Sequence, residues 1–180
     1  MTAFATLYLS HLIADFPLQT NRIYRLKTES NQGILLHVAI HLLVASILVK
    51  DSLASWPVLL VLGVAHFLID WTKLRYPGRR QTPGFLLDQF AHFLTVALLA
   101  LWRPELTAVI PLWLTFWAIL LILLPATLVF LWVWATDLRV DLPENHTVKW
   151  ACRSLLPISQ RLGSVLVLVL TATTILFLIV

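Results

Sequence analysis

The sequence contains little cysteine and little charge. Its only cysteine, Cys152, excludes an internal disulfide and a metal cluster built from several thiolates. Charged residues make up 12% of the 180 residues, whereas about a quarter is usual in soluble domains. Hydrophobic residues make up 59%, and the mean hydropathy is +0.87. This composition predicts an integral membrane protein, with lipid as its surroundings and no nucleic-acid partner.

Hydrophobic runs predict about six transmembrane helices within a single domain, residues 1–180. The runs are close to the roughly 20 apolar residues that cross a bilayer, and they cover about 2–18, 34–50, 56–73, 85–102, 108–135 and 162–180. The first lacks a basic leader and a small-residue cleavage site, so we expect a retained span rather than a signal peptide. The expected fold is all-α, a polytopic membrane helix bundle.

The two halves of the chain are expected to differ in role. Residues 1–103 should form a four-helix core that bears the His and Asp residues described below, and residues 104–180 should add two further spans. Between these two spans, over about 137–161, charged residues alternate with apolar ones. This pattern predicts an interfacial segment that lies on the membrane surface.

Basic residues are concentrated in every second connection between the runs. The first, third and fifth connections hold Arg22, Arg25, Lys27, Lys73, Arg75, Arg79, Arg80, Arg139, Lys149, Arg153 and Arg161. The other two connections hold only Lys50 and Arg103. Because cytoplasmic loops are enriched in Lys and Arg, both termini are predicted to lie outside the cytoplasm.

Four of the runs each carry two metal-capable side chains four residues apart. The pairs are His11/Asp15, His37/His41, His66/Asp70 and Asp88/His92. Residues i and i+4 share one face of a helix, so each pair forms a stripe. Burying such groups in an apolar helix costs on the order of several kcal/mol unless they pair with one another or bind a ligand. Eight of them in register therefore predict a site, although His–Asp hydrogen bonds that fix helix packing are the alternative.

The predicted orientation places the eight residues in two layers. Asp15, His37, Asp70 and Asp88 lie nearer the cytoplasmic surface, and His11, His41, His66 and His92 lie about one turn deeper. Carboxylates and imidazoles from four helices are a common way for helix bundles to hold one or two metal ions. Nitrogen and oxygen ligands without thiolates favour zinc, with manganese or iron as alternatives.

Each residue of the candidate site is assigned a role. The metal ligands are His11, His37, His41, His66, Asp70 and His92. The shallow carboxylates Asp15 and Asp88 are the candidates for a catalytic base, or for orienting a ligating histidine. Residues near the cytoplasmic mouth would contact an anionic substrate, and these are Gln19, Arg22, Arg25, Lys73, Arg75 and Gln89.

The same motifs resemble a family of bacterial membrane proteins known as domain of unknown function 3307. The matching runs are HLIADFPLQTN (11–21), LLHVAIHLL (35–43), HFLIDWTKLR (66–75) and FLLDQFAHFL (85–94), and the likeness covers roughly residues 7–100. The resemblance implies a bacterial inner-membrane protein but no reaction. A looser likeness, through HxxxD motifs at membrane depth, is to membrane-bound metal-dependent hydrolases.

The leading functional prediction is an intramembrane metal-dependent hydrolase. Its substrate would be an anionic, lipid-like amphiphile, such as a lipid phosphate, reached from the cytoplasmic leaflet. The alternatives are a divalent-metal transporter or channel, and a di-iron or haem redox protein. The sequence leaves the oligomeric state open.

Overall fold

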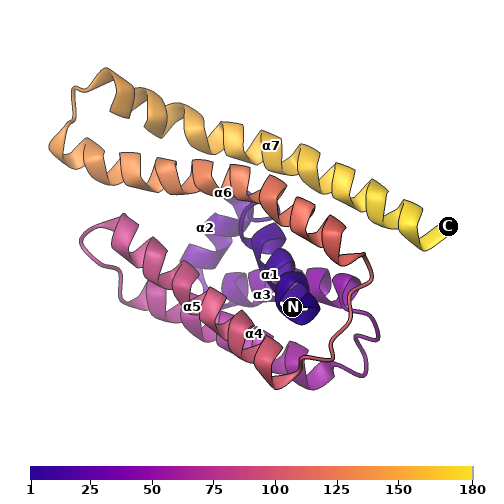
Figure 1. Cartoon of the computed structure of the whole chain (residues 1–180). Helices are drawn as coiled ribbons and strands as arrows, with labels where there is room; N and C mark the ends of the chain where they lie inside the picture. Colours follow the sequence, from indigo (N-terminus) through magenta and orange to yellow (C-terminus); the bar gives the residue numbers. More distant parts are fainter. Residues whose placement is uncertain (180) are drawn as a thin grey trace.

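The computed structural model describes residues 1–179, with side chains up to residue 176. The regular secondary structure of this part of the chain is helical apart from one isolated β-bridge (Figure 1). It confirms the all-α prediction. The helices are α1 (Thr2–Asp15), α2 (Asn21–Glu29), α3 (Asn31–Leu48), α4 (Trp56–Arg75), α5 (Gln81–Trp102), α6 (Leu112–Asp141) and α7 (His146–Ile179).

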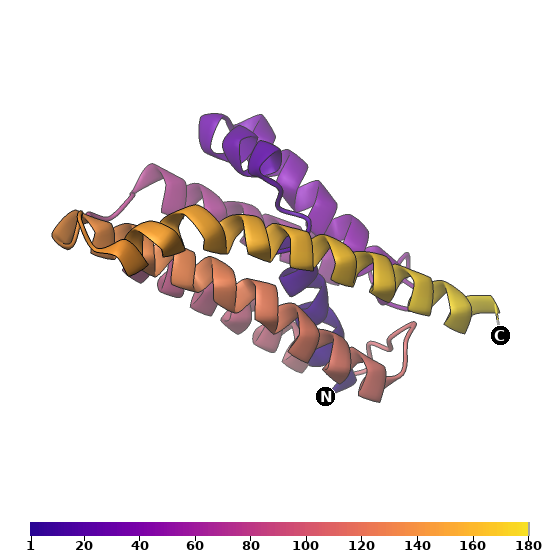
Figure 2. The ribbon, with the colours of Figure 1, turned by 90° about the horizontal axis from the view of Figure 1, so that it is seen from above.

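Helices α1, α3, α4 and α5 form the predicted four-helix core. Both α1 and α4 pack against α3 and α5, so α1 and α4 occupy opposite corners of the bundle. Helix α6 packs on α1 and α5, and α7 runs beside α6 on the outside, as both ribbon views show (Figures 1 and 2). The first two candidate metal pairs, on α1 and α3, thus face those on α4 and α5.

The first helix differs from the predicted span. Five helices, α3 to α7, are long and apolar enough to cross a membrane. Helix α1 has 14 residues, which correspond to about 21 Å against a hydrocarbon core of about 30 Å. Eleven of these residues are buried, because α3, α5 and α6 surround the helix. In place of six spans, the described residues form five helices long enough to cross a membrane, and the shorter α1 is enclosed by α3, α5 and α6.

A separate interfacial helix over 137–161 was predicted, but the structure divides these residues differently. Helix α6 continues to Asp141, four residues form a tight connection, and α7 then runs without a break from His146. The charged residues of this segment occupy the adjoining ends of two long helices. Charge alternation indicates an amphipathic helix but does not show where a longer helix begins.

An apolar cluster fills one end of the four-helix core, and we call it the apolar floor. It consists of Ala3, Leu7, Ala45, Val49, Val58, Leu62, Val96, Leu99 and Leu106, all at most 6% exposed. Two backbone hydrogen bonds, Lys50 N–H to Thr107 and Val109 N–H to Leu48, join the connections that close this end. The start of α1 lies here, and so does the end of α7, which runs antiparallel to α6 (Figure 2).

Helix α2 packs against α3 at the opposite end of the core. The Thr20 hydroxyl accepts a hydrogen bond from Ile23 N–H and so caps the start of α2. The Ser30 hydroxyl similarly accepts from Gly33 N–H and starts α3 directly after α2 ends. This short corner turns the chain back on itself. One basic residue of α2, Lys27, is thereby buried within the protein.

Candidate metal centre

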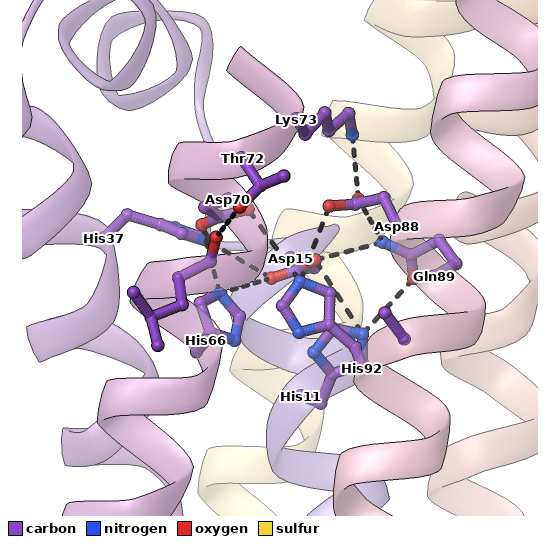
Figure 3. A network of polar contacts seen from close by, with 12 residues as sticks. His11, Asp15, His37, His66, Asp70, Thr72, Lys73, Asp88, Gln89 and His92 are labelled. Carbon is purple, nitrogen blue, oxygen red and sulfur yellow. Dashed lines mark hydrogen bonds and ion pairs between the residues drawn. The ribbon is translucent and has the colours of Figure 1, made fainter. Parts of the chain in front are cut away.

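All eight predicted His and Asp residues are buried, and seven of them converge closely at the centre of the four-helix core. None of the eight is more than 7% exposed. The close-up shows side chains from separate helices pointing toward Asp15 (Figure 3). Three overlapping groups have ligand atoms within 4.8 Å of one another: His11/His66/His92, Asp15/His37/His66 and Asp70/Asp88/His92. Spacing along the sequence thus identified residues that the fold brings together.

Asp15, His37, His66 and Asp70 form the tightest set, which we call subsite 1. Asp15 Oδ1 lies 3.1 Å from His37 Nε2 and 3.5 Å from His66 Nε2. Asp70 Oδ2 lies 3.8 Å and 3.4 Å from the same two nitrogens. Four ligands placed tetrahedrally at about 2.0–2.1 Å from a zinc ion would be separated by about 3.3–3.4 Å. The four measured separations lie near or above this value, and three of the residues, Asp15, His37 and His66, have ligand atoms within 4.8 Å of one another.

The geometry within subsite 1 is not fully explained by hydrogen bonding. Asp15 Oδ1 does form a hydrogen bond with His37 Nε2. By contrast, His66 Nε2 and Asp70 Oδ2, although 3.4 Å apart, lack the geometry of a mutual hydrogen bond. Two buried polar atoms that approach without bonding to each other are suited to share a third partner. A metal ion between them would satisfy both.

A second set, Asp70, Asp88 and His92, adjoins the first, and we call it subsite 2. His92 Nε2 lies 3.8 Å from Asp70 Oδ1 and 3.7 Å from Asp88 Oδ1. Asp70 therefore turns one oxygen toward each subsite. Asp15 is similar: its Oδ1 faces subsite 1, and its Oδ2 lies 3.8 Å from His11 Nε2. Carboxylates shared in this way are typical of bundle sites with two cation positions.

The four deeper histidines stack beneath these carboxylates. The ring centroid of His66 lies 4.2 Å from that of His92 and 4.4 Å from that of His41. His11 lies 4.7 Å from His92 and 5.7 Å from His41. Both ring nitrogens of His41 are buried without a hydrogen-bond partner among the described residues, and His41 belongs to none of the three close groups. Of the predicted ligands, His41 is the one that belongs to none of these close groups.

Two lysines complete the electrostatics of the centre. The Lys27 ammonium lies 2.7 Å from Asp70 Oδ1, and the Lys73 ammonium lies 2.8 Å from Asp88 Oδ2. Burial alone would lower the pKa of Lys27, but the carboxylates of Asp70 and Asp15 outweigh it and raise that pKa above its ordinary value. Lys27 therefore carries its charge into the centre.

The sequence placed Lys27 only among the basic residues of the first connection. Its burial depends on α2 folding back along α3, which no local pattern in the sequence indicates. One signal was available: Lys27 is the only basic residue in the last turn of α2, and the amphipathic helix must direct one face toward the protein.

Gln89, predicted to contact substrate, links the carboxylates and a histidine. Its amide nitrogen donates to Asp15 Oδ2 at 3.2 Å and to Asp88 Oδ2 at 3.3 Å, while its oxygen lies 3.2 Å from His11 Nε2 (Figure 3). Acceptance by the oxygen would require His11 to carry its proton on Nε2. Gln89 therefore orients residues of the centre.

The other residues predicted to bind substrate lie at the outer edge. Arg22 and Arg25 are exposed on α2, where Arg25 pairs with Glu29. Gln19 accepts a hydrogen bond from the Lys27 ammonium at 3.3 Å. Arg75 lines a surface pocket of about 150 Å³ together with Lys27, Thr28, Glu29, Ser30, Asn31, Ile34, Trp71 and Leu74. The two α2 arginines are not gathered at the centre.

One family of known proteins matches the part of the chain that carries these motifs. The family model described as "Protein of unknown function (DUF3307)" matches residues 3–121, from α1 to the first third of α6. This range includes every His and Asp residue of the centre. No curated protein and no solved structure matches the chain.

Proposed function

The chain belongs to the DUF3307 family, proteins of unknown function, and from that premise we propose that it is a membrane-embedded, metal-dependent hydrolase. The observation that carries the proposal is subsite 1, where oxygens of Asp15 and Asp70 each lie 3.1–3.8 Å from the Nε2 atoms of His37 and His66. A structural role alone would be served by hydrogen-bonded pairs. Zinc fits two imidazoles and two carboxylates, and manganese or iron would use the same ligands.

The chemistry of hydrolysis would be divided between the ion and the chain. A bound dication lowers the pKa of a coordinated water and polarises the bond to be broken. The chain would orient the reactants: Gln89 holds Asp15 and Asp88, and a carboxylate that does not bind the ion would accept the proton of the water. Asp88, which belongs to subsite 2 and not to subsite 1, is the better placed of the two for this role.

The proposed substrate is an amphiphile with an anionic head, such as a lipid phosphate. The Lys73 side chain is 35% exposed, so its ammonium can be approached from outside while it contacts Asp88. Arg75, at the end of α4, lines a surface pocket beside α2 and the start of α3. Ammonium and guanidinium groups are suited to bind phosphate oxygens. We propose that this mouth faces the cytoplasmic leaflet of a bacterial inner membrane, as the basic connections predict.

Transport of a divalent metal is disfavoured by one feature of the core. The apolar floor lies between the centre and the end where α3–α4 and α5–α6 connect, and it offers Ala, Val and Leu side chains. An ion that crossed the membrane here would lose all its ligands before it reached that end. The arrangement suits a site that opens on one side.

The experiment has two steps. Protein purified without chelators is analysed for bound transition metals, and zinc, manganese and iron are titrated into metal-free protein. Metal-loaded and metal-free protein are then assayed for release of products from phosphomonoesters, phosphodiesters and carboxyl esters that carry short acyl chains. The proposal expects one or more bound ions and turnover that requires them. Protein that binds none of the three metals would overturn it.

A further inference from the structure

We infer that Lys27 and Lys73 occupy the second cation position of a centre that has the carboxylate framework for two metal ions. The inference rests on the proposed function, because it takes subsite 1 to be the metal site. It concerns subsite 2, where Asp70, Asp88 and His92 also present ligand atoms within 4.8 Å of one another. The protein would thus be a one-metal enzyme in which two ammonium groups replace the second ion.

The contacts at subsite 2 are already those of a cation site. Asp70 Oδ1 is 2.7 Å from the Lys27 ammonium, and Asp88 Oδ2 is 2.8 Å from the Lys73 ammonium. Two-metal centres place a second dication about 3.5–4 Å from the first and use shared carboxylates between them. Asp70 is shared here, since its Oδ2 faces His37 and His66 while its Oδ1 faces Lys27 and His92. The ammonium of Lys27 therefore lies on the side where a second ion would bind.

The balance of charge favours one ion over two. Asp15, Asp70 and Asp88 supply three negative charges and the two lysines supply two positive ones, so the buried centre carries one negative charge when its imidazoles are neutral. One dication changes this to a single positive charge, which a hydroxide or a singly charged anion would balance. A second dication would leave three positive charges in an apolar surrounding, where uncompensated charge is expensive.

Burial distinguishes the two lysines. The Lys27 side chain is only 7% exposed and reaches the centre from α2, whereas the Lys73 side chain is 35% exposed and comes from the last turn of α4. Lys27 is thus fixed as an internal cation, and Lys73 can contact both Asp88 and a molecule at the mouth. An ammonium offers hydrogen-bond donors to an anionic oxygen, where a second metal would offer coordination.

Metal stoichiometry tests the inference directly. Metal-free protein is titrated with Mn²⁺ and followed by calorimetry and by electron paramagnetic resonance, in which neighbouring Mn²⁺ ions give a coupled spectrum. The wild type should bind one ion and give an uncoupled spectrum. The variant Lys27→Met/Lys73→Met should bind two ions and give a coupled spectrum. Lys50→Met/Lys149→Met, which removes two lysines that make no contact with the centre, should bind one.

The outcomes separate this inference from the proposed function. A wild type that binds two ions overturns the inference and leaves a metal enzyme in place, whereas a wild type that binds none overturns both. A folded double variant that still binds one ion also overturns the inference. Should the double variant not fold, Lys73→Met alone decides: it removes one positive charge from a partly exposed position and should tighten binding of the second ion at least about tenfold. Unchanged binding would contradict the replacement of a metal ion by lysine.

Discussion

Gly33 lies directly against the backbone of Leu26, and a Cβ at Gly33 would be 1.9 Å from the Leu26 carbonyl oxygen. The neighbouring atom belongs to the main chain of α2, so a side-chain rotation cannot make room. Glycine at this position is therefore what allows α2 to fold closely against α3. Because Lys27 follows Leu26 in the chain, the same contact determines whether its ammonium can reach Asp70.

The substitution Gly33→Ala should consequently displace α2 and weaken the contact between Lys27 and Asp70. Overpacking of this kind costs roughly 1–3 kcal/mol. We expect a lower melting temperature in detergent and faster amide hydrogen exchange over residues 21–29. Gly84→Ala is the matched control, since a Cβ there has no neighbour within 4 Å and alanine is the better helix former. Equal exchange in both variants would show that α2 does not need this close approach.

Substitutions in the centre should distinguish residues that bind the metal from residues that only lie near it. His66→Ala removes a nitrogen close to both Asp15 and Asp70, so metal affinity should fall by about 100-fold or more, since the loss of a residue that only supports a ligand already costs roughly 10–100-fold. His41→Ala should retain the metal more fully, because His41 lies outside the three close groups. Calorimetric titration of zinc provides the measurement.

The control for these substitutions is His146→Ala, which changes an exposed histidine at the start of α7. It should bind metal as the wild type does. Asp15→Asn keeps the shape of the side chain but removes its charge, and should weaken binding because Asp15 contacts both His37 and His66. Indistinguishable affinities for the His66 and His146 variants would leave the centre without a metal-binding role.

The four-helix core and its eight polar residues could be predicted because both follow from short-range spacing. A helix repeats every 3.6 residues, so His66 and Asp70 necessarily share a face, and burial in apolar segments requires that face to meet others. The family resemblance covered the same motifs. The spacing of residues does not indicate that α1 is short and enclosed. Its 14 residues are covered by packing against other helices, α6 among them.

The position of Lys27 could not be predicted for a related reason. A lysine in a basic connection is usually exposed, as Arg22 and Arg25 are here. Its burial depends on the corner between α2 and α3, where the Ser30 hydroxyl and Gly33 act together over a few residues. Gln89 follows Asp88 in the sequence and was predicted to contact substrate, but its contact with Asp15 on α1 depends on how distant helices pack.

The start of α5 is capped from another helix, which allows a second test of stability. Arg80 precedes α5 and supplies no side-chain cap, whereas Asp137 of α6 accepts hydrogen bonds from Gln81 N–H at 2.8 Å and Thr82 N–H at 2.7 Å. Asp137→Ala should therefore cost about 1 kcal/mol, as the loss of a helix cap does. Thermal unfolding in detergent measures the change.

The matched comparison is Asp141→Ala, one turn farther along α6. Asp141 pairs with Arg80 at 2.8 Å, but both side chains are largely exposed, and exposed ion pairs contribute little. We expect the Asp137 variant to be the less stable of the two, and to lose protection from amide exchange in the first turn of α5. A larger loss of stability at Asp141 would mean that the ion pair with Arg80, and not the cap on α5, is the more important contact between α6 and the start of α5.

Membrane topology is the final prediction, and the structure makes it sharper. The start of α1 and the end of α7 both lie at the end of the apolar floor. The basic connection at 76–80 lies at the other end, as does the 142–145 connection, which Arg139 and Lys149 flank. The positive-inside rule then places both termini outside the cytoplasm, even though α1 is shorter than a full span. Cysteines introduced at Ser52 and at Gly78, in a Cys152→Ser background, should label oppositely with a membrane-impermeant maleimide in intact cells. Labelling should occur at position 52 and require cell lysis at position 78. The reverse pattern would place the mouth of the centre on the outer side, and the proposed access from the cytoplasmic leaflet would then be wrong.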